Sequence, residues 1–335
     1  MSDHGYKDRE LIYQQIEKER GSKVINYVTG DRLGMETNIH PEVIDLFVDH
    51  LDKLWPMEKL TLILYTSGGD TAVAWRLINL LRTFCEELEI LVISKAHSAG
   101  TLMCLGANRI IMTKQATLSP IDPSLFHFLG PQTPNGSRVP VSVEEVQSYL
   151  DVAKYTLNIN LPEPLAQVLM HLSSQIHPLV LGQIFRTRSQ IRSLAEKLLQ
   201  YQNIKDDKKE EIVSFLCSDS GSHDHTINRR EAKELGLVID KPSEEFYQTL
   251  KALQENISNT LLLRSRFSLD TELAGKSETG YTLRRAMIES VSYGCYHYVS
   301  QGKLTRFEIP ATQPGREPTV GVEDTRLFEG WRKEA

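Results

Sequence analysis

The chain has 335 residues, of which 40% are apolar and 24% are charged, an ordinary balance for a globular protein. Its net charge of −6 argues against nucleic acid as the main partner, because phosphate binding needs a basic surface. No apolar run approaches the length of a membrane span, and the charged first residues do not resemble a secretory signal, so we expect a cytoplasmic protein.

The first 22 residues predict a charged helical arm, after which strands and helices alternate. Residues 59–66 and 89–95 are near-continuous apolar runs, as expected for strands buried on both faces. The predicted elements follow in the order strand 23–30, helix 41–54, strand 59–66, helix 71–84, strand 89–95, helix 98–108 and strand 109–113. This alternation is typical of an α/β fold with a largely parallel sheet.

The rest of the chain divides into three parts. Residues 142–217 predict a helical insertion, and residues 227–240 a short helix followed by a strand. We therefore expect a catalytic domain over residues 23–240. Residues 241–335 predict a C-terminal extension that is helical at first and irregular further on.

Two glycine-containing turns follow neighbouring strands, where ligands of parallel sheets collect. One contains Gly68 and Gly69, and the other contains Ser98 and Ala99. A serine nucleophile needs a sharp turn, a base and donors for the developing oxyanion. Ser98 is the candidate nucleophile, and the amides of Gly68, Gly69 and Ala99 are candidate oxyanion donors. The alternative is that Ser98 only caps a helix and that the glycines only form a tight turn.

The sequence resembles the Clp protease and signal peptide peptidase A superfamily, which pairs a Gly-Gly turn with a Ser-small-Gly turn at this spacing. The segments that carry the resemblance are YTSGGDT (65–71) and AHSAGTLMCLGANRIIMT (96–113). Further segments resemble the serine dehydrogenase proteinase branch, namely LSPIDPS (118–124), IHPLVLG (176–182) and INRREAKELGL (227–237). The resemblance covers about residues 25–240. It implies a Clp–crotonase-like fold, peptidase activity, a homo-oligomer and no cofactor.

The resemblance also implies a residue that orients the base. In the Clp subunit a catalytic aspartate precedes a short helix that ends in Gly-Leu-Val-Asp, and the matching residue here is Asp224. The Clp histidine has no counterpart, because the matching place reads LSPIDPS. His127 lies a few residues further on, in a predicted loop.

A serine–lysine dyad, as in the signal peptide peptidase branch, is another option. Lys154 shares a predicted helical face with Val143, Val146 and Leu150, where a lysine is either partly buried or extends to the edge of the apolar stripe. His97 is a third candidate, although adjacent residues on a strand point to opposite sides. The base is therefore left open among Lys154, His97 and His127.

These observations predict a serine peptidase that cleaves a polypeptide substrate, with no metal and no cofactor. His223 and His225 flank Asp224, but no third metal ligand has a diagnostic spacing. One alternative is a catalytically inactive scaffold, supported by the missing histidine. The other is a crotonase-type acyl-coenzyme A enzyme, which shares the fold and the oxyanion hole without needing a serine nucleophile.

Overall fold

The computed structural model describes residues 5–121, 124–125, 128–139, 141–219, 225–309 and 319–334. The strands are β1 (Lys23–Thr29), β2 (Lys59–Thr66), β3 (Glu87–Ala96), β4 (Arg109–Met112), β5 (Thr117–Leu118), β6 (Ser124–Leu125), β7 (Val141–Ser142), β8 (Ile227–Asn228), β9 (Ile239–Asp240), β10 (Glu278–Ser290), β11 (Gly294–Ile309) and β12 (Thr319–Lys333).

The helices are α1 (Tyr6–Arg20), α2 (Val43–Leu54), α3 (Thr71–Phe84), α4 (Ala99–Leu105), α5 (Val143–Asp151), α6 (Pro162–Gln175), α7 (Pro178–Leu198), α8 (Asp206–Ser214), α9 (Arg229–Leu235), α10 (Glu244–Thr260) and α11 (Leu269–Leu273). Short turns extend three of them, namely the π-helical η1 (Val152–Thr156) and η3 (Phe215–Asp219) and the 3-10 turn η2 (Leu199–Tyr201). None of the helices in these described ranges combines the length and the apolar character needed to cross a bilayer.

Among the described residues, ten strands form one mixed sheet. Its order is β12-β11-β10-β1-β2-β3-β4-β9, and β5 and β8 are attached beside β3. Strands β1, β2, β3, β4 and β9 pair in parallel, and helices cross between β1, β2, β3 and β4 because parallel neighbours need such crossovers. The predicted α/β fold with a parallel sheet is confirmed.

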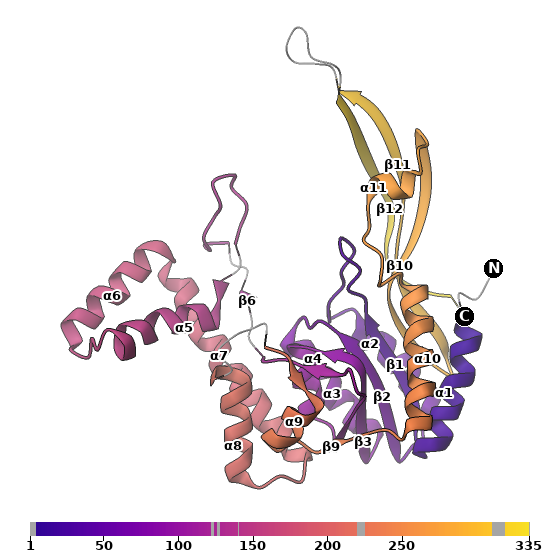
Figure 1. Cartoon of the computed structure of the whole chain (residues 1–335), viewed down its shortest axis with the longest axis horizontal. Helices are drawn as coiled ribbons and strands as arrows, with labels where there is room; N and C mark the ends of the chain where they lie inside the picture. The colour runs from indigo at the N-terminus through magenta and orange to yellow at the C-terminus, as the bar shows by residue number, and fades with distance from the viewer. Residues whose placement is uncertain are drawn as a thin grey trace.

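Helices cover both faces of the parallel part of the sheet (Figure 1). Alternate side chains of each strand enter opposite layers, as the two-residue period of a strand requires. Ile25 and Leu62 pack with α2, α3 and α4 on one face, whereas Val24 and Ile63 pack with α1 and α10 on the other. This burial on both faces explains the continuous apolar runs of β2 and β3.

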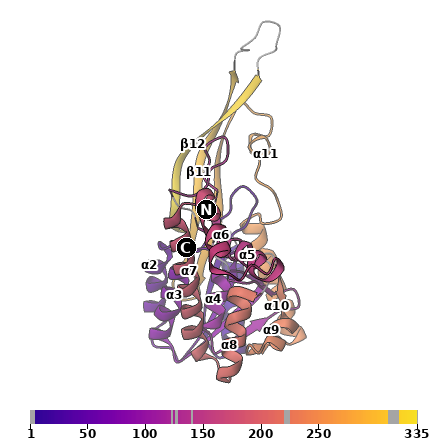
Figure 2. The same ribbon diagram turned by 90° about the vertical axis from the view of Figure 1, so that its left-hand side faces the viewer.

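The C-terminal segment differs from the prediction. Instead of an irregular end, the described part contains the three antiparallel strands β10, β11 and β12, and β10 joins the sheet by pairing with β1. Only the half of β10 beside β1 is fully buried. The outer half extends with its neighbours as a long ribbon beyond the rest of the fold (Figure 2), so it lacks a continuous apolar pattern.

The insertion forms a separate helical arm that projects from the sheet (Figure 1). Its helices α5, α6 and α7 share a small core that includes Val143, Val146, Leu172 and Ile184. The predicted helical character of this part is confirmed, and α8 continues it towards the sheet.

A buried ion pair fastens α1 to β10. Arg9 Nε and Nη2 donate to the two carboxylate oxygens of Glu289 at 2.8 and 2.6 Å, and both side chains are inaccessible to solvent. The hydroxyl of Tyr13 donates to the same carboxylate. Burial alone would raise the pKa of Glu289, but the hydrogen bonds and charge of Arg9 outweigh it and hold the pKa below its ordinary value.

We expect Glu289→Ala to lower the free energy of unfolding by about 3–5 kcal/mol, because it leaves the Arg9 charge buried and unpaired. Urea denaturation of the variant measures the loss. The matched control is Glu278→Ala, which removes an exposed ion pair with Lys303 and should cost at most about 1 kcal/mol. Equal losses in the two variants would contradict this role of the buried pair.

The buried imidazole of His50 predicts acid sensitivity. Its Nδ1 lies 2.7 Å from Ser290 Oγ, and burial lowers its pKa to about 4. In the unfolded chain, by contrast, a histidine is protonated below about pH 6.5. Neutral His50 therefore contributes its full stability to the fold above about pH 6.5. This contribution, roughly 3 kcal/mol, is lost as the pH falls from about 6.5 to about 4. We expect His50→Gln to flatten the pH profile of urea denaturation between pH 6.5 and 4. An unchanged pH profile in this variant would show that groups other than His50 cause the loss of stability in acid.

Candidate active site

Ser98 occupies a strained turn between β3 and α4. Its backbone has φ 51° and ψ −113°, a combination outside the regions that non-glycine residues favour. Such strain persists only where the surrounding structure enforces it, and it is common at active sites. The side chain is half-buried and makes no capping hydrogen bond to α4, so the alternative of a simple helix cap does not describe it.

The Gly68–Gly69 turn lies directly against this serine. Both glycines have positive φ, at 119° and 140°. A Cβ on Gly68 would lie 2.9 Å from Ser98 Cβ, and one on Gly69 would lie 2.4 Å from the backbone nitrogen of Ile39. Ile39 fixes the turn by donating to the Gly68 carbonyl and accepting from the Asp70 amide, at 2.9 and 3.0 Å. The two turns therefore meet, and only glycine fits where they do.

The backbone amides around Ser98 are not equally available. The Ser98 amide donates to Ser119 Oγ at 2.8 Å, and the Gly68 amide donates to Thr66 Oγ1 at 3.0 Å. Within the described part of the chain, the amides of Gly69 and Ala99 donate to no acceptor. Of the three predicted donors, Gly69 and Ala99 thus remain free, and Gly68 serves to hold the turn.

Buried hydroxyl groups support both turns. Thr66 Oγ1 accepts from Thr29 Oγ1 at 2.7 Å while it receives the Gly68 amide. The methyl group of Thr66 leaves no room for a side chain at position 100, because a Cβ on Gly100 would lie 2.4 Å from Thr66 Cγ2. Thr66, Ser119 and Ile39 were not predicted from the sequence, because a threonine at a strand end or a serine in a loop carries no periodic signal.

His97 is directed to a neighbouring strand. Its Nε2 lies 2.8 Å from Thr117 Oγ1 of β5, and the ring is half-buried. Its backbone amide donates to the Thr66 carbonyl at 3.1 Å, which helps to join β3 to β2. This arrangement agrees with the expectation that adjacent residues diverge, and it gives His97 a positioning role in the turn.

Lys154 lies on the helical arm with an exposed side chain. The α-helix ends at Asp151, and the following π-helical turn changes the periodicity, so Ala153 takes the buried position instead of Lys154. The predicted apolar face is present at Val143 and Val146 but does not reach Lys154. Among the described residues, no hydrogen bond or ion pair joins its ammonium group to Ser98.

Asp224, His127 and His223 lie outside the described residues. His225 is described, and its Nε2 lies 2.6 Å from Glu231 of α9.

One group of potential metal ligands occurs in the described ranges, away from the two turns in the sequence. Ligand atoms of Glu289, Cys295 and His297 lie within 4.8 Å of one another. Arg9 already engages the Glu289 carboxylate, and burial together with that carboxylate raises the pKa of Cys295 to about 12. A protonated thiol beside an arginine fits a buried ion-pair network better than a metal centre.

We expect Gly68→Ala to lower the free energy of unfolding by at least about 2 kcal/mol, because the new Cβ meets Ser98 while the backbone keeps a positive φ. Gly21→Ala is the matched control. Gly21 also has positive φ, but nothing lies within 4 Å of its Cβ position, so we expect a loss of about 1 kcal/mol. If urea denaturation shows equal losses of unfolding free energy in the two variants, the close approach of Gly68 to Ser98 does not exclude a side chain at position 68.

Comparisons with known proteins bear on this site. The chain is similar to two uncharacterized proteins of Methanocaldococcus jannaschii. It is 26% identical over 202 residues to MJ0137, covering 59% of each chain, and 23% identical over 236 residues to MJ1495, covering 68% of this chain and 70% of that protein. The chain thus spans less than two thirds of the length of the first of these relatives.

Two solved structures of the 1510-N membrane-bound stomatin-specific protease are also similar. A serine-to-alanine mutant has a TM-score of 0.40 and 15% identity, covering 68% of this chain and 84% of its own. A lysine-to-alanine mutant in complex with a substrate peptide has a TM-score of 0.39 and 16% identity, covering 68% and 80%.

Residues 48–145 match the family model described as ClpP-like SDH-type serine proteinase. The matched residues include the Gly68–Gly69 turn, Ser98 and Ala99, but neither Lys154 nor Asp224. The segment that carries both turns of the candidate site is therefore similar to the ClpP-like SDH-type serine proteinases.

Proposed function

We propose that this protein is a serine peptidase in which Ser98 Oγ attacks the carbonyl carbon of a peptide bond. The observation that carries the proposal is the strained, half-buried Ser98, which lies so close to Gly68 that a Cβ on that glycine would meet it. Among the described residues, the amides of Gly69 and Ala99 in the same two turns donate to no acceptor. A turn of this kind presents a hydroxyl to a substrate backbone, and glycine neighbours leave room for it.

The proposed first step forms an Oγ–carbon bond and moves the carbonyl electron pair onto oxygen. The amides of Gly69 and Ala99 are the proposed donors to this oxyanion, and Gly68 holds its turn in place. The hydroxyl proton passes to a base and then to the leaving amine. Water subsequently hydrolyses the acyl-enzyme ester and regenerates Ser98.

The base is proposed among Lys154, His97 and His127, with Asp224 orienting it. His97 is nearest in sequence to Ser98, but its Nε2 is engaged by Thr117. Lys154 would need to leave its exposed position on the arm and approach Ser98 before it could act as the base. Catalytic hydrogen bonds are often completed only when substrate binds, so the open arrangement does not remove these candidates.

A catalytically inactive scaffold is the second candidate function. The supporting observation is that Ser98 Oγ has no hydrogen-bond partner among the described residues. A crotonase-type acyl-coenzyme A enzyme has no such support from a particular residue. It would be favoured if Ser98→Ala retained turnover of an acyl thioester.

A homo-oligomer is proposed as the working form, in the cytoplasm. The helical arm supports an oligomer, because large exposed apolar side chains gather on it between residues 149 and 185. They are Tyr149, Val152, Tyr155, Leu157, Leu161, Leu169, Met170, Leu179 and Phe185. Such a concentration of apolar surface marks an interaction site on a protein that folds in water.

We expect a fluorophosphonate probe to label the folded wild-type protein at Ser98 with loss of fluoride, because the proposed amide donors stabilise the negative charge that develops on the phosphoryl oxygen. Mass spectrometry of peptides locates the label. Ser98→Ala should abolish it, whereas Ser189→Ala, which removes an exposed hydroxyl on α7, should leave it unchanged. An unlabelled wild-type protein that unfolds cooperatively would favour the inactive scaffold.

A further inference from the structure

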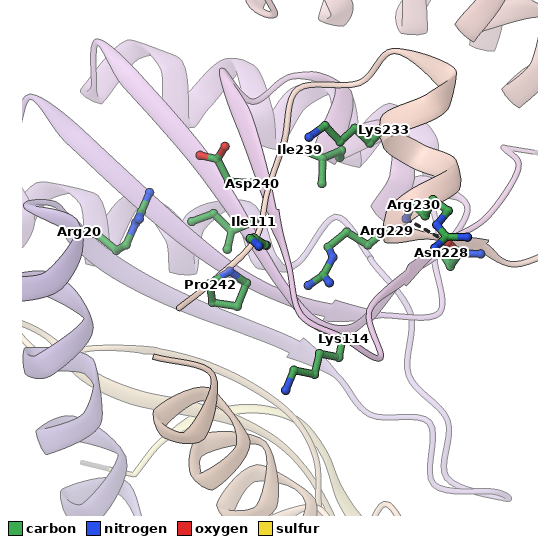
Figure 3. Close-up of a pocket in the computed structure, with 11 residues that line it drawn as sticks. Arg20, Ile111, Lys114, Asn228, Arg229, Arg230, Lys233, Ile239, Asp240 and Pro242 are labelled. Carbon is green, nitrogen blue, oxygen red and sulfur yellow. Dashed lines mark hydrogen bonds between the residues drawn. The ribbon is translucent and has the colours of Figure 1, made fainter. Parts of the chain in front are cut away.

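A second site lies at the β9 edge of the sheet, apart from Ser98. It is a groove of about 610 Å³ between α9, the strands β4 and β9, and the C-terminal end of α1 (Figure 3). Six cationic side chains line it, namely Arg20, Lys114, Arg229, Arg230, Lys233 and Lys241. We call it the basic groove. Its volume is in the range of small-molecule sites.

The charge of the basic groove is opposite to that of the chain. Asp240 is the one carboxylate in its lining, and it is paired with Arg109 at 3.2 Å. In a protein with a net charge of −6, six cations in one concavity repel each other and raise the local concentration of anions.

Only two of the six cations are neutralised by carboxylates. Arg20 makes a bidentate pair with Glu89 at 2.8 Å, and Lys114 pairs with Glu244 at 2.7 Å. Across the described ranges, the other four have no acidic partner: Arg229, Arg230, Lys233 and Lys241. Four positive charges therefore remain available to a ligand.

One of these cations is held in place in advance. Arg229 donates from Nη1 to the Met112 carbonyl at 3.2 Å, which leaves its other N–H groups free for a ligand. A guanidinium fixed in this way can form two parallel hydrogen bonds with a phosphate, whereas Lys233 and Lys241 supply mobile point charges.

The floor of the basic groove is apolar. Ile111, Ile239 and Pro242 lie in its lining, and in the view of Figure 3 Ile111 and Pro242 lie between Arg20 and Arg229. A ligand with an organic part can place that part on these side chains while its anionic part meets the cations of α9. The limited volume of the groove and this floor favour a small molecule over an extended polyanion.

We propose that the basic groove binds a small anion that carries a diphosphate group. Two adjacent phosphates supply about two to three negative charges within a few ångströms, and the four cations without an acidic partner are sufficient to neutralise them. Inorganic pyrophosphate and a nucleoside diphosphate share this chemistry, and the apolar floor would add affinity for the second.

Isothermal titration calorimetry of the full chain with pyrophosphate and with ADP tests the proposal, at about 50 mM and about 200 mM salt. We expect both ligands to bind, and to bind more weakly at the higher salt. Arg230→Gln/Lys233→Gln should weaken both by at least about tenfold, because it removes two charge-assisted contacts. Tighter binding of ADP identifies an organic diphosphate, and equal binding identifies the diphosphate group alone.

The matched control is Lys53→Gln/Lys276→Gln, which removes two exposed charges elsewhere and should change affinity less than twofold. Both double variants alter exposed side chains, so circular dichroism should show native folding. Three outcomes would overturn the proposal. They are no heat from either ligand at millimolar concentration, equal affinity in the two double variants, and preferential binding of an acidic peptide or an oligonucleotide.

Discussion

The close approach of Gly68 to Ser98 is the constraint on which the candidate site depends. Each turn lies at the end of a parallel strand, so the register of β2 and β3 brings the two together. The space between them excludes a Cβ, and the strain at Ser98 is maintained by the hydrogen bonds of Thr66, Ser119 and Ile39. The fold thus joins the turn that carries the Ser98 hydroxyl to the Gly68–Gly69 turn, and the amides of Gly69 and Ala99 donate to no acceptor among the described residues.

Much of this arrangement could be predicted from the sequence. Buried parallel strands have continuous apolar runs, and the Gly-Gly and Ser-Ala-Gly turns follow two of them, so the fold and the position of Ser98 are local signals. Which of the predicted oxyanion donors has a free amide cannot be predicted from the local sequence. Whether Gly68 or Gly69 offers a free amide depends on the Thr66 hydroxyl and on Ile39, which reaches the turn from another segment.

The differences from the prediction have physical causes. The α-helical spacing puts Lys154 in line with an apolar face, and the π-helical turn that begins at Val152 leaves its side chain exposed, which is one of the two outcomes expected for it. The ribbon of β10 to β12 was not predicted because the outer half of β10 buries only alternate side chains, such as Tyr281 and Leu283, in a small core. This short alternation is a weaker sequence signal than the continuous apolar runs of β2 and β3. The basic groove could not be found from composition, since its cations come from α1, α9 and the segments that follow β4 and β9, and are gathered only by folding.

A crystal structure of the protein treated with a peptide boronic acid tests the central claim most directly. The account predicts a covalent bond between boron and Ser98 Oγ, with one boronate oxygen within about 3.1 Å of the amide nitrogens of both Gly69 and Ala99. A boronate attached to another residue, or one bound to Ser98 with its oxygens directed away from both amides, would contradict it.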